Sequence, residues 1–167
     1  MKTIDLNCDM GESYGAWKMG DDAGVMPHIS SANIACGFHG GDPHVMRKSV
    51  ELALTHGVAI GAHPGLPDLM GFGRRRMDVS PQEIKDIHRY QVGALWAFVK
   101  ASGSTLQHVK AHAIQYHMFE DNLELGRASA EPWMACSMVD SLQAAVSHSV
   151  DSHWRMSFSV SSRFLPT

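Results

Sequence analysis

Four short apolar runs along the chain each end abruptly in charged or imidazole side chains. They are residues 3–12 (TIDLNCDMGE), 32–42 (ANIACGFHGGD), 58–65 (VAIGAHPG) and 106–112 (LQHVKAH). Short runs of this kind, bounded by Gly and Pro, are typical of β-strands. We therefore predict strands near residues 3–7, 32–36, 58–62 and 106–110.

Two stretches between these runs begin with helix start signals. An Asp-Pro pair at 42–43 and a Ser-Pro pair at 80–81 each place a capping side chain before a proline in the first helical position. Glu83 completes a capping box with the serine. Apolar residues at helical spacing follow both signals, so we predict helices near 43–56 and 81–102.

The alternation of strands and helices predicts an α/β fold with a parallel sheet. In such sheets the carboxyl ends of the strands meet at one edge, where functional groups gather. The residues that the pattern places there are Asp9, Glu12, His39, Asp42, His63, Lys110 and His112. Residues 64–78 have no regular period, and we expect this long Gly- and Pro-containing loop to lie over the site.

The composition changes sharply near residue 128. All 15 glycines lie at or before Gly126, and serine becomes frequent after it. We therefore divide the chain into residues 1–128, which carry the β/α units, and a divergent Ser-rich tail of residues 129–167. In the tail the pattern permits a helix near 131–147 and a strand near 155–160, and it predicts no site.

Charge and composition exclude several function classes. A formal net charge of −3 gives no basis for binding nucleic acid or an anionic membrane. No apolar run approaches the roughly 18 residues of a membrane span, and the first strand leaves no room for a signal peptide. Three cysteines without CxxC spacing indicate neither a disulfide framework nor a zinc knuckle. We expect a cytoplasmic protein with a small-molecule substrate.

Four motifs in order resemble the LamB/YcsF family. They are DLNCDMGES, SSANIACGFHGGD, GAHPG and HVKAH. The resemblance implies an irregular parallel β/α barrel of the glycoside hydrolase/deacetylase type, present here as about four β/α units. It also implies a 5-oxoprolinase activity: with two further subunits and ATP, family members open the lactam 5-oxo-L-proline (pyroglutamate) to L-glutamate.

The chain departs from the family pattern in two places. After HVKAH the family usually continues Gly-Ala-Leu-Tyr, whereas residues 113–116 here read Ala-Ile-Gln-Tyr. From about Ser129 the resemblance stops, well before the roughly 250 residues of a complete barrel. A truncated or frameshifted gene product would look like this, so we expect little or no turnover from the 167-residue chain itself.

The reaction implied by the resemblance needs a base, a cation and groups that hold the substrate. Asp9 and Glu12 are candidate bases or ligands for Mg²⁺ or another divalent ion, and Lys110 is the candidate cation. The candidate proton carriers or ligands are His39, His63 and His112. The candidate substrate-binding residues are Asn7, Asn33 and Asp42.

Several of these residues also have a purely structural interpretation. Asp5 and Asn7 alternate with apolar neighbours and can be hydrogen-bonding groups inside the barrel, and Asp42 can act first as a helix N-cap. Arg74–Arg76 is either a solvated run or a contact for an ATP phosphate. Cys36 is better explained as a small buried residue than as a nucleophile, because the sequence shows no base beside it.

Two other functions compete with the lactam hydrolase. In a metal-dependent deacetylase of a small acetylated sugar, Asp9, His63 and His112 would bind a divalent ion that activates water without ATP. In an inactive fragment, the four β/α units would keep the site residues of the ancestral enzyme but lack the other half of the barrel, which would leave an unpaired sheet edge.

Overall fold

The structure is a computed structural model that describes residues 4–144, and in it parallel strands alternate with helices. The elements are β1 (Asn7–Met10), α1 (Asp22–Val25), the 3-10 helix η1 (Met26–His28), β2 (Ser31–Ala35), α2 (Pro43–Thr55), β3 (Ala59–His63), α3 (Pro81–Ala101), β4 (His108–Val109), α4 (Gln115–Asp121) and α5 (Leu123–Ala144). The predicted α/β class is confirmed. Among the described residues, no helix is both long and apolar enough to cross a bilayer.

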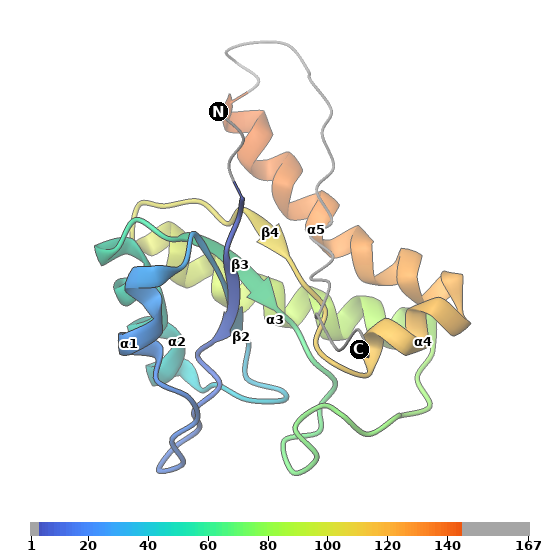
Figure 1. Cartoon of the computed structure of the whole chain (residues 1–167). Helices are drawn as coiled ribbons and strands as arrows, with labels where there is room; N and C mark the ends of the chain where they lie inside the picture. Colours follow the sequence, from blue (N-terminus) through green and yellow to red (C-terminus); the bar gives the residue numbers. More distant parts are fainter. Residues whose placement is uncertain (1–3, 145–167) are drawn as a thin grey trace, which may run out of the picture.

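The four strands form one parallel sheet in the order β1-β2-β3-β4 (Figure 1). Each strand pairs with the strand that follows it in the sequence, with helices in the connections. Strand order that follows sequence order, with a helix after each strand, is the arrangement of a β/α barrel. The described residues therefore form four units of an irregular parallel β/α barrel, as predicted.

One face of the sheet is apolar and forms the main core. Met10, Ile34 and Ala62 lie side by side in the strand register and are almost completely buried. They pack against α2 and α3, which contribute Met46, Val50, Ala53, Val92, Leu95 and Val99. Each fully buried aliphatic side chain of this size stabilises the fold by about 1.5–3 kcal/mol, so this core fixes the helices behind the sheet.

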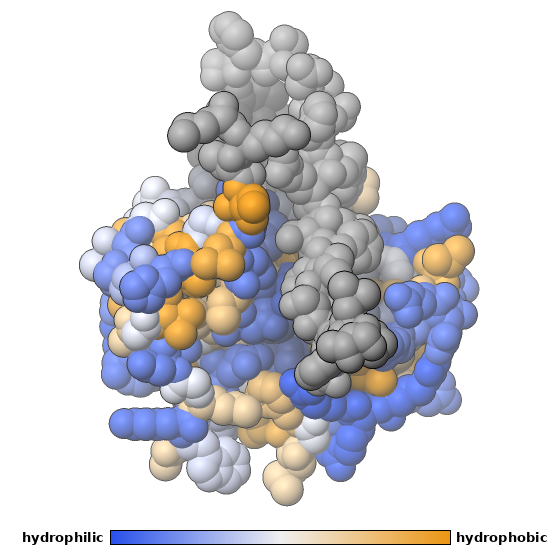
Figure 2. All heavy atoms as spheres, in the orientation of Figure 1, coloured by the Kyte–Doolittle hydropathy of each residue, from blue (hydrophilic) through white to orange (hydrophobic). Residues whose placement is uncertain are grey.

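The other face of the sheet is polar. The register places Asp9, Asn33, Gly61 and His108 in one row across the four strands. Figure 2, in the orientation of Figure 1, shows hydrophilic residues across the middle of the molecule on the side away from α3. The carboxyl ends of the strands thus border a polar surface on which a site can form.

Both predicted helices are confirmed, together with their start signals. Asp42 accepts hydrogen bonds from the backbone N–H groups of His44 and Val45, each at 2.9 Å, at the start of α2. Ser80 and Glu83 form the complete capping box at the start of α3. The two caps set where these helices leave the strand ends.

The predicted position of the first strand is wrong. We expected it near residues 3–7, but β1 spans Asn7–Met10. Ile4 and Leu6 continue the apolar alternation of the strand, yet their exposed fractions are 91% and 58%. The reason is that β2 begins at Ser31, the register partner of Asn7, so residues before Asn7 have no partner strand. The other strands lie within two residues of their predicted positions.

The last described helix crosses the predicted composition boundary. We expected a helix near 131–147, and α5 begins earlier, at Leu123. The possible strand near 155–160 lies outside the described residues. The division of the chain at residue 128 stays a prediction.

Ala113, between β4 and α4, provides a test of backbone strain. Its φ is 44°, in the left-handed region that costs a residue with a Cβ about 1–2 kcal/mol. We expect Ala113→Gly to raise the free energy of unfolding by about 1 kcal/mol, because glycine relieves this strain but is more flexible in the unfolded chain. Urea unfolding measures the difference. Ala97→Gly, at an exposed position inside α3, is the control and should lower stability by about 1 kcal/mol.

His88 provides a test of acid stability. This α3 residue is buried, and burial lowers its pKa from 6.5 to about 4 despite a hydrogen bond to Gln115 at 3.2 Å. Between these two values the unfolded chain binds a proton that the folded chain does not. The titration of His88 therefore leaves the free energy of unfolding unchanged above pH 6.5 and lowers it by about 3 kcal/mol as the pH drops to 4.

We expect His88→Gln to lose less unfolding free energy than the unmodified chain over that pH interval, as measured by urea unfolding. The exposed His117→Gln is the control and should follow the unmodified chain. Equal acid sensitivity of the His88 variant and the unmodified chain would contradict the assignment.

Candidate active site at the carboxyl edge of the sheet

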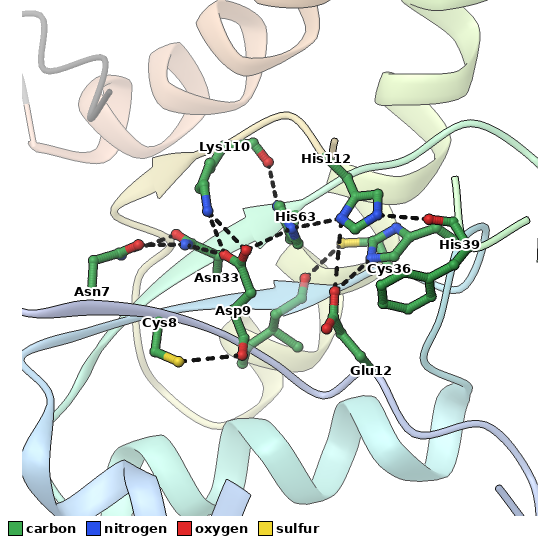
Figure 3. Close-up of polar contacts among 12 residues, drawn as sticks. Asn7, Cys8, Asp9, Glu12, Asn33, Cys36, His39, His63, Lys110 and His112 are labelled. Atoms are coloured by element: carbon green, nitrogen blue, oxygen red, sulfur yellow. Dashed lines mark hydrogen bonds and ion pairs between the residues drawn. The ribbon is translucent and has the colours of Figure 1, made fainter. Parts of the chain in front are cut away.

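The polar face is joined by hydrogen bonds centred on Asn33 of β2 (Figure 3). The Asn33 Nδ2 donates to Asp9 Oδ1 at 2.7 Å and to Asn7 Oδ1 at 2.5 Å. The Nε2 of His108 donates to Asn33 Oδ1 at 2.6 Å. Asn33 is completely buried, so these bonds replace those it would make with water and connect the strands across the polar face.

Asp9, near the end of β1, forms the ion pair of the site. Lys110 Nζ lies 2.6 Å from Asp9 Oδ1 and 2.8 Å from Oδ2, and His63 Nε2 lies 3.4 Å from Oδ2. Burial alone would raise the pKa of the Asp9 carboxyl, but the hydrogen bonds and charges of His63 and Lys110 outweigh it and lower this pKa far below its ordinary value. Asp9 is therefore ionised near neutral pH and fixes the position of the Lys110 ammonium.

Beside this ion pair, three imidazoles and one carboxylate surround a common point (Figure 3). His112 Nδ1 lies 2.9 Å from His63 Nε2. Glu12 Oε1 lies 3.2 Å from His39 Nε2 and 3.7 Å from His112 Nδ1. One ligand atom from each of these four residues lies within 4.8 Å of the other three, and we call the four residues the imidazole cluster. Such a cluster could hold a divalent metal ion.

Glycines leave the space that two of the imidazoles occupy. A Cβ on Gly61 of β3 would overlap the ring of His108, and a Cβ on Gly65 would overlap the ring of His39. Any larger residue at either position would push the ring out of its place. The glycines of the GAHPG motif therefore have a packing role in the site.

Burial keeps two rings of the cluster neutral. It lowers the pKa of His112 to about 3, with the charges of His39 and His63 acting in the same direction. Burial also lowers the pKa of His39, against the opposing effect of Glu12. Neutral imidazoles offer nitrogen lone pairs, so both rings are suited to bind a cation or to accept a hydrogen bond from water.

The loop of residues 64–78 contacts the imidazole cluster through Phe72. The carbonyl oxygen of Phe72 accepts a hydrogen bond from His112 Nε2 at 2.8 Å, and the Phe72 ring packs edge-on against His39 and His112. The φ of Phe72 is 53°, a strained conformation of the kind often found at functional sites. The loop thus orients one of the three imidazoles.

The three arginines of this loop are engaged within the protein. Arg75 forms an ion pair with Asp68, and Arg76 bonds to Asp121 at 2.8 Å. The Arg74 guanidinium lies 5.5 Å from the centre of the Phe72 ring. These contacts hold the loop against the rest of the chain, which favours the structural interpretation of the arginine run.

Most of the predicted site residues lie together on the polar face of the sheet or at its carboxyl edge, with Asn7 at the start of β1 and Asn33 in the middle of β2. They are Asn7, Asp9, Glu12, Asn33, His39, His63, Lys110 and His112. Asp42 differs: its carboxylate oxygens accept hydrogen bonds from the backbone of α2 and from Gly15 N–H at 2.8 Å. Its N-cap role is confirmed, while the catalytic and substrate-binding roles of the whole set stay predictions.

Sequence reasoning missed two residues that shape the site, and it gave Cys36 a role that the structure supports. His108 shares the two-residue period of Lys110, and that period could have placed it on the same face. Phe72 had no signal beyond the length of its loop.

Cys36 is buried, and burial raises its pKa to about 12, which excludes a thiolate nucleophile near neutral pH.

The cluster that the structure brings together is not the same as the predicted metal set, which stays a prediction. We expected Asp9, His63 and His112, but both oxygens of Asp9 bond to Lys110. Glu12 and His39 complete the cluster instead. The arrangement is compatible with a divalent ion, and its three nitrogen donors do not suit Mg²⁺, which prefers oxygen.

Comparisons with known proteins agree with the motifs. The LamB/YcsF family matches residues 4–157, so the match extends beyond Ser129, where we expected the resemblance to stop. The A subunit of 5-oxoprolinase from Bacillus cereus is 61% identical over 131 residues, which cover 78% of this chain and 52% of that protein. The protein of the same name from Bacillus anthracis is 60% identical over the same length and coverage. The chain thus spans about half the length of the curated relatives it matches.

A solved structure shares the fold. The crystal structure of a lactam utilization protein from Thermus thermophilus superposes with a TM-score of 0.78 at 52% sequence identity. The match covers 80% of this chain and 54% of that one.

The ion pair leads to a prediction about charge. Lys110→Met removes the ammonium that helps lower the Asp9 pKa, so we expect this pKa to rise toward its ordinary value. Carboxyl-carbon NMR titration of Asp9 measures the change. Lys85→Met removes the lysine of another ion pair, Lys85–Glu131, and should leave the Asp9 titration unchanged. An unchanged Asp9 titration in the Lys110 variant would show that the ion pair does not exist in solution.

Proposed function

Because the chain belongs to the LamB/YcsF family, we propose that it acts as the A subunit of a 5-oxoprolinase, which opens the lactam of 5-oxo-L-proline to L-glutamate. The relatives support this proposal by their names, which are those of a lactam utilization protein and of a 5-oxoprolinase component. The part of those relatives that this chain matches includes the four strand ends that carry the ion pair and the imidazole cluster.

The observation that carries the proposal is the Lys110 ammonium, held by both oxygens of Asp9. A lactam is a poor electrophile, and its opening requires stabilisation of negative charge on the amide oxygen. An ammonium has three N–H donors, of which Asp9 takes two. The third can bind the lactam oxygen, so Lys110 stabilises the developing charge and Asp9 positions Lys110.

The attacking water is assigned to the imidazole cluster. Asp9 is a weak base because its pKa is lowered far below its ordinary value, and a base works best with a pKa near the working pH. Glu12 and the neutral His39 and His112 offer acceptor atoms that can hold and orient a water molecule beside Lys110. Asn7 and Asn33 are proposed to bind polar groups of the substrate.

ATP, a divalent ion and two further subunits complete the proposal. Activation of the lactam oxygen by ATP would make the ring carbon easier to attack. The 167 residues contain no Gly-Lys pair, and hence no P-loop lysine. We assign lactam binding to the carboxyl edge of this chain and ATP binding to the assembled enzyme.

One observation favours a second candidate, the metal-dependent deacetylase. Three imidazoles and a carboxylate around one point are a suitable ligand set for an ion that activates water without ATP. This function requires turnover of an acetylated sugar, and the names of the relatives give it no support.

Binding of the lactam tests the proposal independently of turnover. We expect the chain to bind 5-oxo-L-proline more tightly than L-proline, because only the lactam has an oxygen for Lys110. Lys110→Met should weaken 5-oxo-L-proline binding by roughly tenfold to a hundredfold, since a hydrogen bond to a charged group is worth about 1.5–3 kcal/mol. Isothermal titration measures both differences, with Lys85→Met as the control.

Activity is tested by exchanging residues 4–128 of this chain into a full-length relative, supplied with its partner subunits. We expect ATP-dependent glutamate release, reduced by about a hundredfold or more when Lys110→Met is included. Equal binding of proline and 5-oxo-L-proline, or deacetylation of an acetylated sugar without ATP, would contradict the proposal.

A further inference from the structure

Two nitrogens of the imidazole cluster, one from His63 and one from His112, face each other. His63 Nδ1 lies 2.7 Å from the carbonyl oxygen of Lys110, and His112 Nε2 lies 2.8 Å from that of Phe72. A carbonyl oxygen only accepts, so both of these nitrogens carry the ring hydrogen. The other two nitrogens, His63 Nε2 and His112 Nδ1, lie 2.9 Å apart, and neither carries a hydrogen unless its ring holds a second proton.

Two lone pairs at this distance repel each other unless a cation lies between them. Either a proton or a metal ion can supply the charge. A proton on His63 Nε2 would lie between His112 Nδ1, at 2.9 Å, and Asp9 Oδ2, at 3.4 Å, and would leave Glu12 and His39 without a role. A proton would also need only these two nitrogens, yet the cluster contains two more donors.

His39 and Glu12 are the further donors, and both point to the same place. His39 is completely buried, and among the described residues its Nδ1 has no hydrogen-bond partner. The one polar bond of the ring joins its Nε2 to Glu12 Oε1, inside the cluster. Gly65 leaves the space that lets the ring lie there.

The spacing fits a tetrahedral ion. With bonds of about 2.0–2.1 Å, the ligand atoms of a tetrahedral zinc lie about 3.3 Å apart. Three of the six distances in the cluster are 2.9, 3.2 and 3.7 Å, and all six are within 4.8 Å. Backbone carbonyls already fix two of the imidazole tautomers, which is the usual supporting contact of a metal-binding histidine.

We propose that Glu12, His39, His63 and His112 bind one first-row transition-metal ion of the zinc type, through Oε1, Nε2, Nε2 and Nδ1. The ion would lie beside Lys110 and Asp9. Its use as a Lewis acid on the lactam oxygen or on the attacking water rests on the proposed function. Binding of the ion does not, so the test measures binding alone.

The test uses the chain freed of metal with a chelator and titrated with Zn²⁺, Co²⁺ or Mg²⁺. We expect one Zn²⁺ per chain, a Co²⁺ complex with the visible absorption of low-coordinate nitrogen ligation, and no competition from Mg²⁺. His63→Asn should weaken Zn²⁺ binding by about a hundredfold or more. Gly65→Ala, which keeps all four donors but displaces His39, should weaken it by roughly tenfold to a hundredfold.

His117→Gln removes an exposed histidine of α4 and is the control, with Zn²⁺ binding expected to equal that of the unmodified chain. Circular dichroism establishes that each variant is folded, and if one is not, the Co²⁺ spectrum of the unmodified chain decides. Absence of stoichiometric Zn²⁺, a Co²⁺ spectrum typical of six oxygen ligands, or equal Zn²⁺ affinity of folded His63→Asn and unmodified chain would overturn the proposal. Metal binding with no 5-oxo-L-proline binding would retain this inference and reject the proposed function.

Discussion

Every polar side chain on the inner face of the sheet must find a partner within the protein, and the rest of the site depends on this requirement. The interior of a β/α barrel is usually filled by bulky branched residues, whereas here the strands present Asn, Asp, His and Lys. Asn33 of β2 provides hydrogen-bond partners for polar side chains of two other strands: Asn7 and Asp9 of β1, and His108 of β4. A buried network with its partners in place rigidifies a structure, and an unpaired member would be costly.

The network separates two electrostatic environments that lie side by side. Around Asp9 and Lys110 the charges are opposite and paired, and the lowered pKa of Asp9 keeps its carboxylate ionised near neutral pH. Around His39 and His112 burial favours the neutral rings. His63 joins the two, with its Nε2 near both Asp9 and His112. A fixed ammonium next to neutral lone pairs suits a reaction that needs charge stabilisation and a positioned water.

The sequence predicted those features that depend on local signals. Caps and prolines located α2 and α3, and the polar ends of the apolar runs located the carboxyl edge. The start of β1 was wrong because the alternation of Ile4 and Leu6 does not reveal where the partner strand begins.

The detail of the site could not be predicted because it depends on contacts between distant residues. The Phe72 carbonyl selects the bare nitrogen of His112 from 40 residues away, and no local pattern encodes that bond. The same holds for the contact of Glu12 with His39 and for the ion pair of Asp9 with Lys110, which is 101 residues away in the sequence.

The central claim is that backbone carbonyls fix the imidazole tautomers and direct bare nitrogens to one point. Long-range proton–nitrogen NMR spectra of the histidine rings, recorded near neutral pH with Zn²⁺ present, test it most directly. The account predicts that His63 carries its hydrogen on Nδ1 and His112 on Nε2, with His63 Nε2 and His112 Nδ1 shifted by the metal. A hydrogen on Nε2 of His63, or on Nδ1 of His112, would contradict it.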